Sequence, residues 1–394
     1  MAGLSRTYGS ATVALPLKLQ RVLLLVALLP TACSRTGLDV DRLVDPDGAL
    51  AEGPDAATSC ESDAGIGLVK RLPAVGQVGS SVIDPFDDVY LVIGGLNEDM
   101  NYAQSISDVD LGTGQSQTLP LTGDAVSVGV ILRPVWEPAY ARTIVLGGGV
   151  YGYDSMDMVN DSAQVFAVTI ENGGATTTLL PDFPEGATND ISLPAAADGS
   201  GRLFAIADKG SQTGPVDTWV LDATPGHESW SLFYADPSAA VAGLELVTMT
   251  YDAIGRRLIG LGDPIGQYDQ PSMWALSVDA PSGWVAIPGT VPASLYGYLG
   301  VLGGGAPLTW DQTLCAFVVG AMSESCEYQF WRFDIGDSFT ATALGVAAQP
   351  PIRYGRGVAG YDVHRRNFVF GSAFDCDYEQ DYIALSTDFV PVLP

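Results

Sequence analysis

Two short apolar runs that end in glycine, VYLVIGG at Val89–Gly95 and TIVLGGG at Thr143–Gly149, are the first members of a repeat. An apolar run of this length bounded by turn residues is typical of a β-strand. Four more such runs follow, and the six runs begin 53 to 59 residues apart. The four later runs are Arg202–Asp208, Leu258–Asp263, Leu314–Gly320 and Asn367–Gly371. A period of this size indicates an array of identical structural units.

An acidic residue opens a chain reversal before each run, so we expect a hairpin in front of every repeated strand. After each run comes a polar loop, then a further strand with aromatic or branched residues and another turn. The acidic residues are Asp84, Glu137, Asp198, Asp252, Asp311 and Asp362. Each unit therefore contains four antiparallel strands.

No segment shows a helical period longer than a turn or two, so the units consist of strands. The backbone N–H and C=O groups at the edges of such sheets are protected when the units close into a ring. The sequence predicts an all-β fold, a six-bladed β-propeller of four-stranded antiparallel blades, with seven blades as the alternative. Gly67–Leu72 and Phe389–Leu393 both fit the outermost strand of the last blade. Either the N-terminal strand closes the ring or one of the two adds a fifth strand.

The glycine pairs that end the first two runs, and tryptophans spaced ten or eleven residues apart, resemble the kelch family over about residues 66–394. The spaced tryptophans are Trp219 with Trp230 and Trp274 with Trp284. The resemblance extends to propellers of the galactose-oxidase type and implies that the tryptophans, Trp331 included, pack between blades. A sugar-stacking platform is the alternative reading of these rings. The copper site of such oxidases needs two neighbouring histidines, whereas His227 and His364 fall about half a ring apart.

The N-terminus has the layout of an export signal. Lys18 and Arg21 precede the apolar run Val22–Leu29, and Pro30-Thr31-Ala32-Cys33 follows it. The last four residues resemble a bacterial lipobox, which implies a lipid on Cys33 and a place in the cell envelope, on the outer membrane at its periplasmic or surface side. An ordinary signal peptide that leaves Cys33 as a free thiol is the alternative.

Three segments follow from this layout. Residues 1–32 are the lipoprotein signal peptide, residues 33–64 form a flexible acidic tether without aromatic residues, and residues 65–394 form the propeller. The chain has 46 acidic and 18 basic residues, a formal charge of -28. Such a charge repels phosphate backbones and anionic lipids, so nucleic acid is excluded as a partner and the membrane is reached only through the lipid anchor.

Four cysteines remain after Cys33, an even number for an exported protein. Cys315 and Cys326 lie symmetrically about a hairpin centre that we expect near Gly320, within disulfide range. This pairing leaves Cys60 with Cys376, a bond that would attach the tether to the last blade.

Acidic residues gather in the loops between the second and third strands of four blades: Asn97–Asp99, then Asp154 with Asp157 and Asp161, then Asp263 with Asp269, and last Asp375, Asp377, Glu379 and Asp381. In a propeller these loops share one face, which would form a negative rim. The alternating carboxylates of the last loop suit Ca²⁺, although this loop lacks the glycine of an EF-type site. A solvated rim with no cofactor is the main expectation.

No catalytic set is visible in the sequence. Arg133, Arg353 and Arg356 lie near first strands, where they would form an anion site facing the channel. We expect a binding or scaffolding module for a protein or glycan partner rather than an enzyme. A carbohydrate-active hydrolase or lyase with its site at the channel mouth is the alternative.

Overall fold

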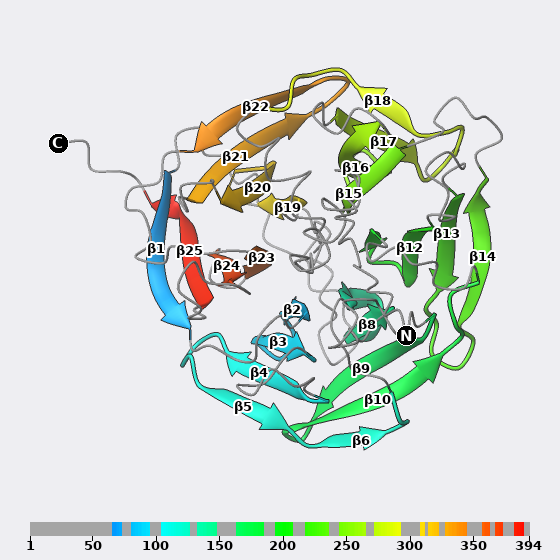
Figure 1. Ribbon diagram of the computed structural model, residues 1–394, viewed down its shortest axis with the longest axis vertical. Coiled ribbons are helices and arrows are strands. Elements are labelled where there is room, and N and C mark those ends of the chain that lie inside the picture. Colours follow the sequence, from blue (N-terminus) through cyan, green and yellow to red (C-terminus); the bar gives the residue numbers. More distant parts are fainter. Residues whose placement is uncertain are drawn as a thin grey trace, which may run out of the picture.

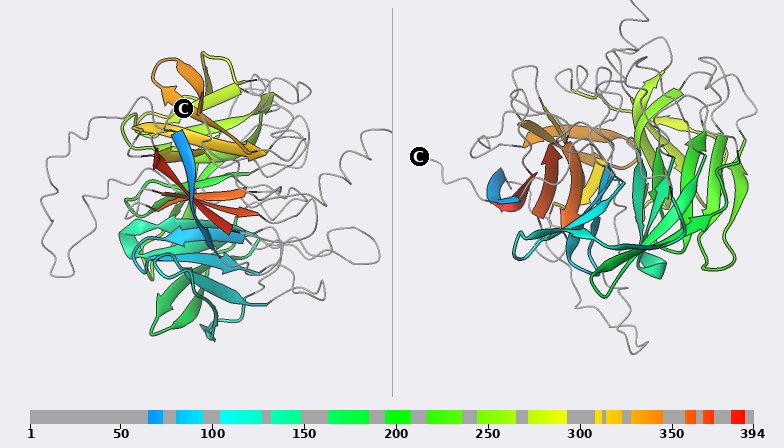
Figure 2. Two further views of the ribbon diagram at one scale, coloured as in Figure 1. Left: turned by 90° about the vertical axis from the view of Figure 1, so that its left-hand side faces the viewer. Right: turned by 60° about the horizontal axis from the view of Figure 1, so that its bottom comes forward.

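The fold consists of six β-sheets arranged around a central axis, seen in a computed structural model of the chain (Figure 1). The structure describes residues 65–72, 80–94, 104–126, 132–147, 163–184, 194–207, 217–235, 244–264, 272–292, 308–311, 314–322, 328–344, 357–362, 367–372 and 382–389. The sheets form a ring when viewed down this axis (Figure 1) and a single layer when viewed edge on (Figure 2). We number the sheets as blades 1 to 6 in chain order.

Each blade runs outward from the axis through four strands in sequence order, except that β1 is the outermost strand of blade 6 and β6 is added outside blade 2. Blade 1 contains β2 (Ser80–Asp84), β3 (Val89–Ile93), β4 (Ile106–Asp110) and β5 (Ser116–Leu119). Blade 2 contains β7 (Arg133–Glu137), β8 (Arg142–Leu146), β9 (Val165–Glu171), β10 (Gly174–Leu180) and, outermost, β6 (Leu121–Gly123). Blade 3 contains β11 (Ala195–Ala197), β12 (Arg202–Ala207), β13 (Asp217–Asp222) and β14 (Ser229–Tyr234).

The other three blades repeat this order. Blade 4 contains β15 (Leu244–Asp252), β16 (Arg257–Pro264), β17 (Ser272–Ser277) and β18 (Val285–Ile287). Blade 5 contains β19 (Leu308–Asp311), β20 (Ala316–Met322), β21 (Tyr328–Ile335) and β22 (Phe339–Leu344). Blade 6 contains β23 (Gly357–Asp362), β24 (Asn367–Ser372), β25 (Tyr382–Phe389) and β1 (Gly65–Leu72).

An all-β propeller built from four-stranded antiparallel sheets is confirmed by this strand order. Five of the six sheets have four strands, whereas the sheet of blade 2 has five, so the predicted four-stranded blade is wrong for blade 2 alone. The described strands form no seventh sheet, so the alternative of seven blades finds no counterpart in this part of the chain.

The extra strand β6 joins blade 1 to blade 2. It follows β5 along the chain and pairs in parallel with β10, with Leu121 opposite Ala175 and Gly123 opposite Thr177. The Thr177 hydroxyl donates to the carbonyls of Thr122 at 3.0 Å and Asp124 at 2.7 Å. All three residues of β6 are exposed, so no apolar pattern marked this strand in the sequence.

Gly123 is the residue on which the β6 pairing depends. Its φ is +92°, and a Cβ built there would lie 2.1 Å from the Thr177 carbonyl oxygen.

Gly123→Ala should therefore detach β6 and lower the free energy of unfolding, measured by urea denaturation. Gly173→Ala is the matched control, because Gly173 has a φ of +75° but no atom within 4 Å of an added Cβ. Gly173→Ala should lower the free energy of unfolding only by the cost of a left-handed backbone at alanine, about 1 kcal/mol. Equal losses of stability in both variants would contradict the role given to β6.

The first strand of the propeller, β1, closes the ring. It pairs antiparallel with β25, the third strand of blade 6, with Gly65 opposite Phe389 and Leu72 opposite Tyr382. The sequence left open which terminal strand is outermost in the last blade. In the structure this is the N-terminal strand, β1. Residues 390–394 lie outside the described residues.

The blades have two distinct ends. At one end, which we call the hairpin-turn face, short turns join the first and second strands, as between Asp84 and Val89. We call the opposite end, where the second strands finish, the loop face. The strand pairing puts Gly65 at the hairpin-turn face and Leu72 at the loop face. The tether expected before Gly65 therefore joins the ring on the hairpin-turn side.

Apolar side chains hold neighbouring blades together. Four buried clusters each combine residues of two adjacent blades, from blades 1 and 2 to blades 4 and 5. All seven tryptophans pack in or against these clusters: Trp136, Trp219, Trp230, Trp274, Trp284, Trp310 and Trp331. The interpretation of the spaced tryptophans as packing between blades is thereby confirmed, and the sugar-stacking alternative is not supported.

Candidate functional site

A buried carboxylate caps the first hairpin of the blades. The Asp84 carboxylate accepts hydrogen bonds from the backbone N–H of Phe86 at 2.9 Å and Asp87 at 3.2 Å. Asp252 accepts from Ile254 and Gly255 in the same way. The equivalent acids are Glu137, Asp198, Asp311 and Asp362, all at or next to the end of an innermost strand. All six acids were found as turn signals in the sequence, and five of them cap their turns in the manner of Asx turns. The residues that directly follow Asp362 lie outside the described part of the chain.

The residue just before the second strand is left-handed in five of these hairpins. The positive φ values belong to Asp88, Ala141, Gly201, Arg256 and Cys315. A turn followed by one left-handed residue returns the chain into an antiparallel partner with the correct twist. The acid therefore fixes the turn, and the left-handed residue starts the next strand.

Glu137 differs from the other five acids because it is a glutamate and reaches the next blade. Its carboxylate accepts from Ala139 N at 3.3 Å and Tyr140 N at 3.1 Å in its own turn, the 3-10 helix η2 (Pro138–Tyr140), and from Gly201 N of blade 3 at 3.2 Å. The side chain is fully buried. Burial raises the pKa of Glu137 from 4.5 to about 7, against the lowering effect of these hydrogen bonds and of Arg142.

This shift makes stability depend on pH. A carboxyl whose pKa is raised on folding contributes stability that is present below pH 4.5 and is lost as the pH rises to about 7. The free energy of unfolding should fall by about 3 kcal/mol across this window. In Glu137→Gln this part of the pH dependence should be absent, as measured by urea denaturation at pH 5 and pH 8. Glu171→Gln, at an exposed turn position, is the control and should keep the wild-type profile; a Glu137→Gln profile parallel to the wild type would refute the assignment.

Two arginines at the starts of second strands bridge consecutive blades. Arg142 of blade 2 pairs with Glu228 of blade 3 at 3.1 Å and also donates to the carbonyl of Ala223. Arg257 of blade 4 binds Asp252 at 2.9 Å and donates to the Gly336 carbonyl of blade 5 at 3.0 Å. Both acceptor carbonyls follow the third strand of the next blade, so the two bridges are equivalent.

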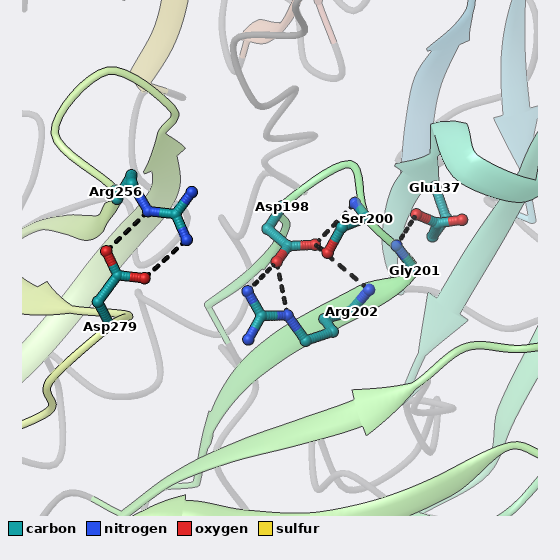
Figure 3. Close-up of polar contacts among 7 residues, drawn as sticks. All are labelled: Glu137, Asp198, Ser200, Gly201, Arg202, Arg256 and Asp279. Atoms are coloured by element: carbon teal, nitrogen blue, oxygen red, sulfur yellow. Dashed lines mark hydrogen bonds and ion pairs between the residues drawn. The ribbon is translucent and has the colours of Figure 1, made fainter. Parts of the chain in front are cut away.

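Blades 3 and 4 carry a second group of charges near the same turns (Figure 3). Asp198 accepts from Arg202 Nε at 2.7 Å and from the Ser200 hydroxyl at 2.8 Å. Arg256 forms a bidentate pair with Asp279, with both distances 2.7 Å. This second pair is open to water, since the side chains of Arg256 and Asp279 are 61% and 55% exposed. Burial, followed by the Asp198 charge, raises the pKa of Tyr251 beside this group.

The bridging and the exposed arginine should differ sharply in their effect on stability. Arg142→Met leaves the Glu228 carboxylate, 11% exposed, without its ion pair, and should lower the free energy of unfolding by about 3 kcal/mol. Arg256→Met removes an exposed, salt-screened pair and should change stability little. Urea denaturation of both variants compares them, and a larger loss in Arg256→Met would show that the bridge between blades is not important.

Few of the predicted site residues lie in the described part of the chain. Arg133 begins β7 at the loop face and is buried, so its guanidinium does not face open solvent. Cys315 precedes β20, and its φ is +48°. Outside the described residues lie Cys33, Cys60, Cys326, Cys376, Arg353, Arg356, Asp375, Asp377, Glu379 and Asp381.

Metal binding has no candidate in the described residues, which bring together no group of three or more metal-ligating side chains. The described part of the chain also holds no helix that is long and apolar enough to cross a membrane.

His227 is exposed in the turn between β13 and β14, as expected, and His364 lies outside the described residues. The contacts missed at the sequence level are those between blades, such as Glu137 with Gly201 and Arg142 with Glu228, for which the sequence carries no local signal.

Comparison with known proteins gives no family. No family model matches the chain, and no curated protein matches it. Among solved structures, YjhT is 11% identical with a TM-score of 0.47, over 67% of this chain and 83% of that one. A mutant Aleuria aurantia lectin in complex with alpha-methyl-L-fucoside is 14% identical with a TM-score of 0.41, over 67% of this chain and 75% of the lectin. Because these scores are low, the assignment of the propeller rests on the strand pairing of the chain itself.

Proposed function

We propose that this protein is an exported, lipid-anchored, kelch-like propeller that binds a protein or glycan partner at its loop face. The supporting observation is the place of the acidic segments relative to the strands. Segments that connect second to third strands, between β3 and β4, β8 and β9, β16 and β17, and β24 and β25, contain the acidic residues found in the sequence. Asp263 is the exception, because it lies within β16.

The described strand ends that flank these four connections lie on the same side of the ring. In every blade the second strand ends away from the hairpin turn, so each connection begins and ends at the loop face. Four negatively charged connections that share one face favour a cationic or neutral partner. Many connections on a rigid ring also allow binding residues to vary without changing the fold.

The hairpin-turn face is less suited to binding. Its acids accept backbone hydrogen bonds within the turns, and its arginines bind acids or carbonyls of the same or the next blade. These groups have partners already, and a ligand would have to displace them.

A carbohydrate-active hydrolase or lyase needs a pair of acids that reach the substrate. Glu137 has a pKa near neutrality, but its side chain is buried and caps a turn. No observation in the described residues therefore favours an enzyme over a binding module.

Binding at the loop face can be tested with the full-length protein on glycan and protein arrays. Asp375→Asn, Asp377→Asn and Asp381→Asn together should weaken binding of the captured partner at least tenfold, because they remove three charges from the loop face. Asp87→Asn, Glu171→Gln and Asp337→Asn together remove three exposed charges from the hairpin-turn face and should leave binding unchanged. The opposite pattern would place the partner on the hairpin-turn face.

Calcium is tested in the same assay. If the four carboxylates of the last loop hold Ca²⁺, a chelator should abolish binding and lower the melting temperature, and millimolar Ca²⁺ should restore both. If the rim is only solvated, sodium chloride at matched ionic strength should act equally, and this is the result we expect.

The lipid anchor predicts that the mature protein partitions into detergent and incorporates labelled fatty acid. Cys33→Ser should yield a form that does neither, because the lipid is attached through this thiol. Equal partitioning and no label in either protein would refute the anchor without affecting the binding test.

A further inference from the structure

Cys315 lies at the hairpin-turn face of blade 5, in the left-handed position directly before β20. Its side chain is disulfide-bonded. The other cysteines of the chain lie outside the described residues, but the described strand ends next to them limit where they can be.

The strand register of blade 5 conflicts with a bond from Cys315 to Cys326. Met322 pairs with Tyr328 and Phe317 with Phe333, so the hairpin centre lies near residue 325 and not near Gly320 as the sequence suggested. About 17 Å separates these two pairs along the strands, and Cys315 lies beyond Phe317. Cys326 is two residues from Tyr328, a reach of about 7 Å. The remaining gap of about 10 Å or more exceeds the Cα separation that a disulfide allows, about 7 Å.

The described strand that follows Cys60 in the sequence, β1, begins on the same face of the ring as Cys315. Cys60 precedes Gly65 by five residues, which span at most about 17 Å, and Gly65 lies at the hairpin-turn face of blade 6. Blades 5 and 6 are neighbours, since β19 and β20 both contact β23. Figure 1 shows β1 as the outermost strand of blade 6, alongside β25, with its beginning toward β22 of blade 5.

The described strand ends that flank Cys326 and Cys376 in the sequence lie on the other side of the ring. Cys326 lies in the connection between β20 and β21, and Cys376 in the connection between β24 and β25. Both connections join second to third strands, so both begin and end at the loop face of these adjacent blades.

We infer that the disulfides are Cys60–Cys315 and Cys326–Cys376, one on each face of the junction between blades 5 and 6. Each bond forms when two thiols lose two protons and two electrons to a disulfide-donating oxidant of the compartment outside the cytoplasm. The two bonds reinforce the junction next to the closing strand β1. Together with the proposed lipid on Cys33, the first bond directs the anchor from the hairpin-turn face, so that the loop face points away from the membrane.

Fragment mapping of the full-length protein, alkylated without reduction, tests the pairing. Cleavage at methionine separates Cys315 from Cys326, because Met322 lies between them, and Cys60 then lies in the fragment that ends at Met100. We expect residues 274–322 to be linked to this fragment. Trypsin, which cuts at Arg332 and Arg353, should then reveal Cys326 linked to Cys376. A link between Cys315 and Cys326, or a free thiol at Cys315, would overturn the inference.

The lipid proposal fails separately in this experiment. Trypsin cuts at Arg35 and Arg42, so Cys33 and Cys60 fall in different peptides. A Cys33–Cys315 link would overturn both proposals, whereas a Cys60–Cys315 link with unlipidated Cys33 would overturn only the anchor.

Variants measure the contribution of the bond. Cys60→Ser and Cys315→Ser should each free one thiol and lower the melting temperature by the same several degrees, and the double variant should lose no more than either one. Additive losses would show that the two cysteines are not partners.

Discussion

The pairing of β1 with β25 is the constraint on which the rest of the ring depends. It brings Gly65–Leu72 beside Tyr382–Phe389, so the two ends of the propeller sequence meet in one sheet. Closing such a long loop costs conformational entropy. The cost is offset because every blade then packs on two neighbours and the last blade no longer exposes the edge of its third strand. The same pairing fixes the face from which the preceding tether leaves.

Within the ring, one local device is repeated with different partners. In five blades an acid at or next to the end of the innermost strand accepts turn N–H groups that have no strand partner. In blade 2 the acid is longer by one methylene and also accepts Gly201 N from blade 3. In blade 4 the aspartate instead holds Arg257, which reaches the carbonyl of Gly336 in blade 5. The turns are therefore also the polar contacts between blades, outside the apolar clusters.

The two faces of the ring differ in their polar contacts. Polar groups on the hairpin-turn face bind one another, so this face stabilises the ring. The loop face carries connections whose sequence the strands do not constrain, and four of them are acidic. A ligand bound there would not disturb the packing between blades, which is the physical basis for the proposal that a partner binds on that side.

The sequence by itself determined the strands, the hairpins and the acids that cap them, because each depends on residues within a few positions of one another. The apolar runs around Val89–Ile93 and Arg142–Leu146 and the caps at Asp84 and Glu137 lie where the patterns indicated. Only the tertiary structure decided the contacts between blades. Strand β6 is three exposed residues paired with a strand of another blade, and Arg142 meets Glu228 across 86 positions. The cysteine pairing also required the register of β20 and β21, because symmetry about an assumed turn does not show which face of the ring each thiol occupies.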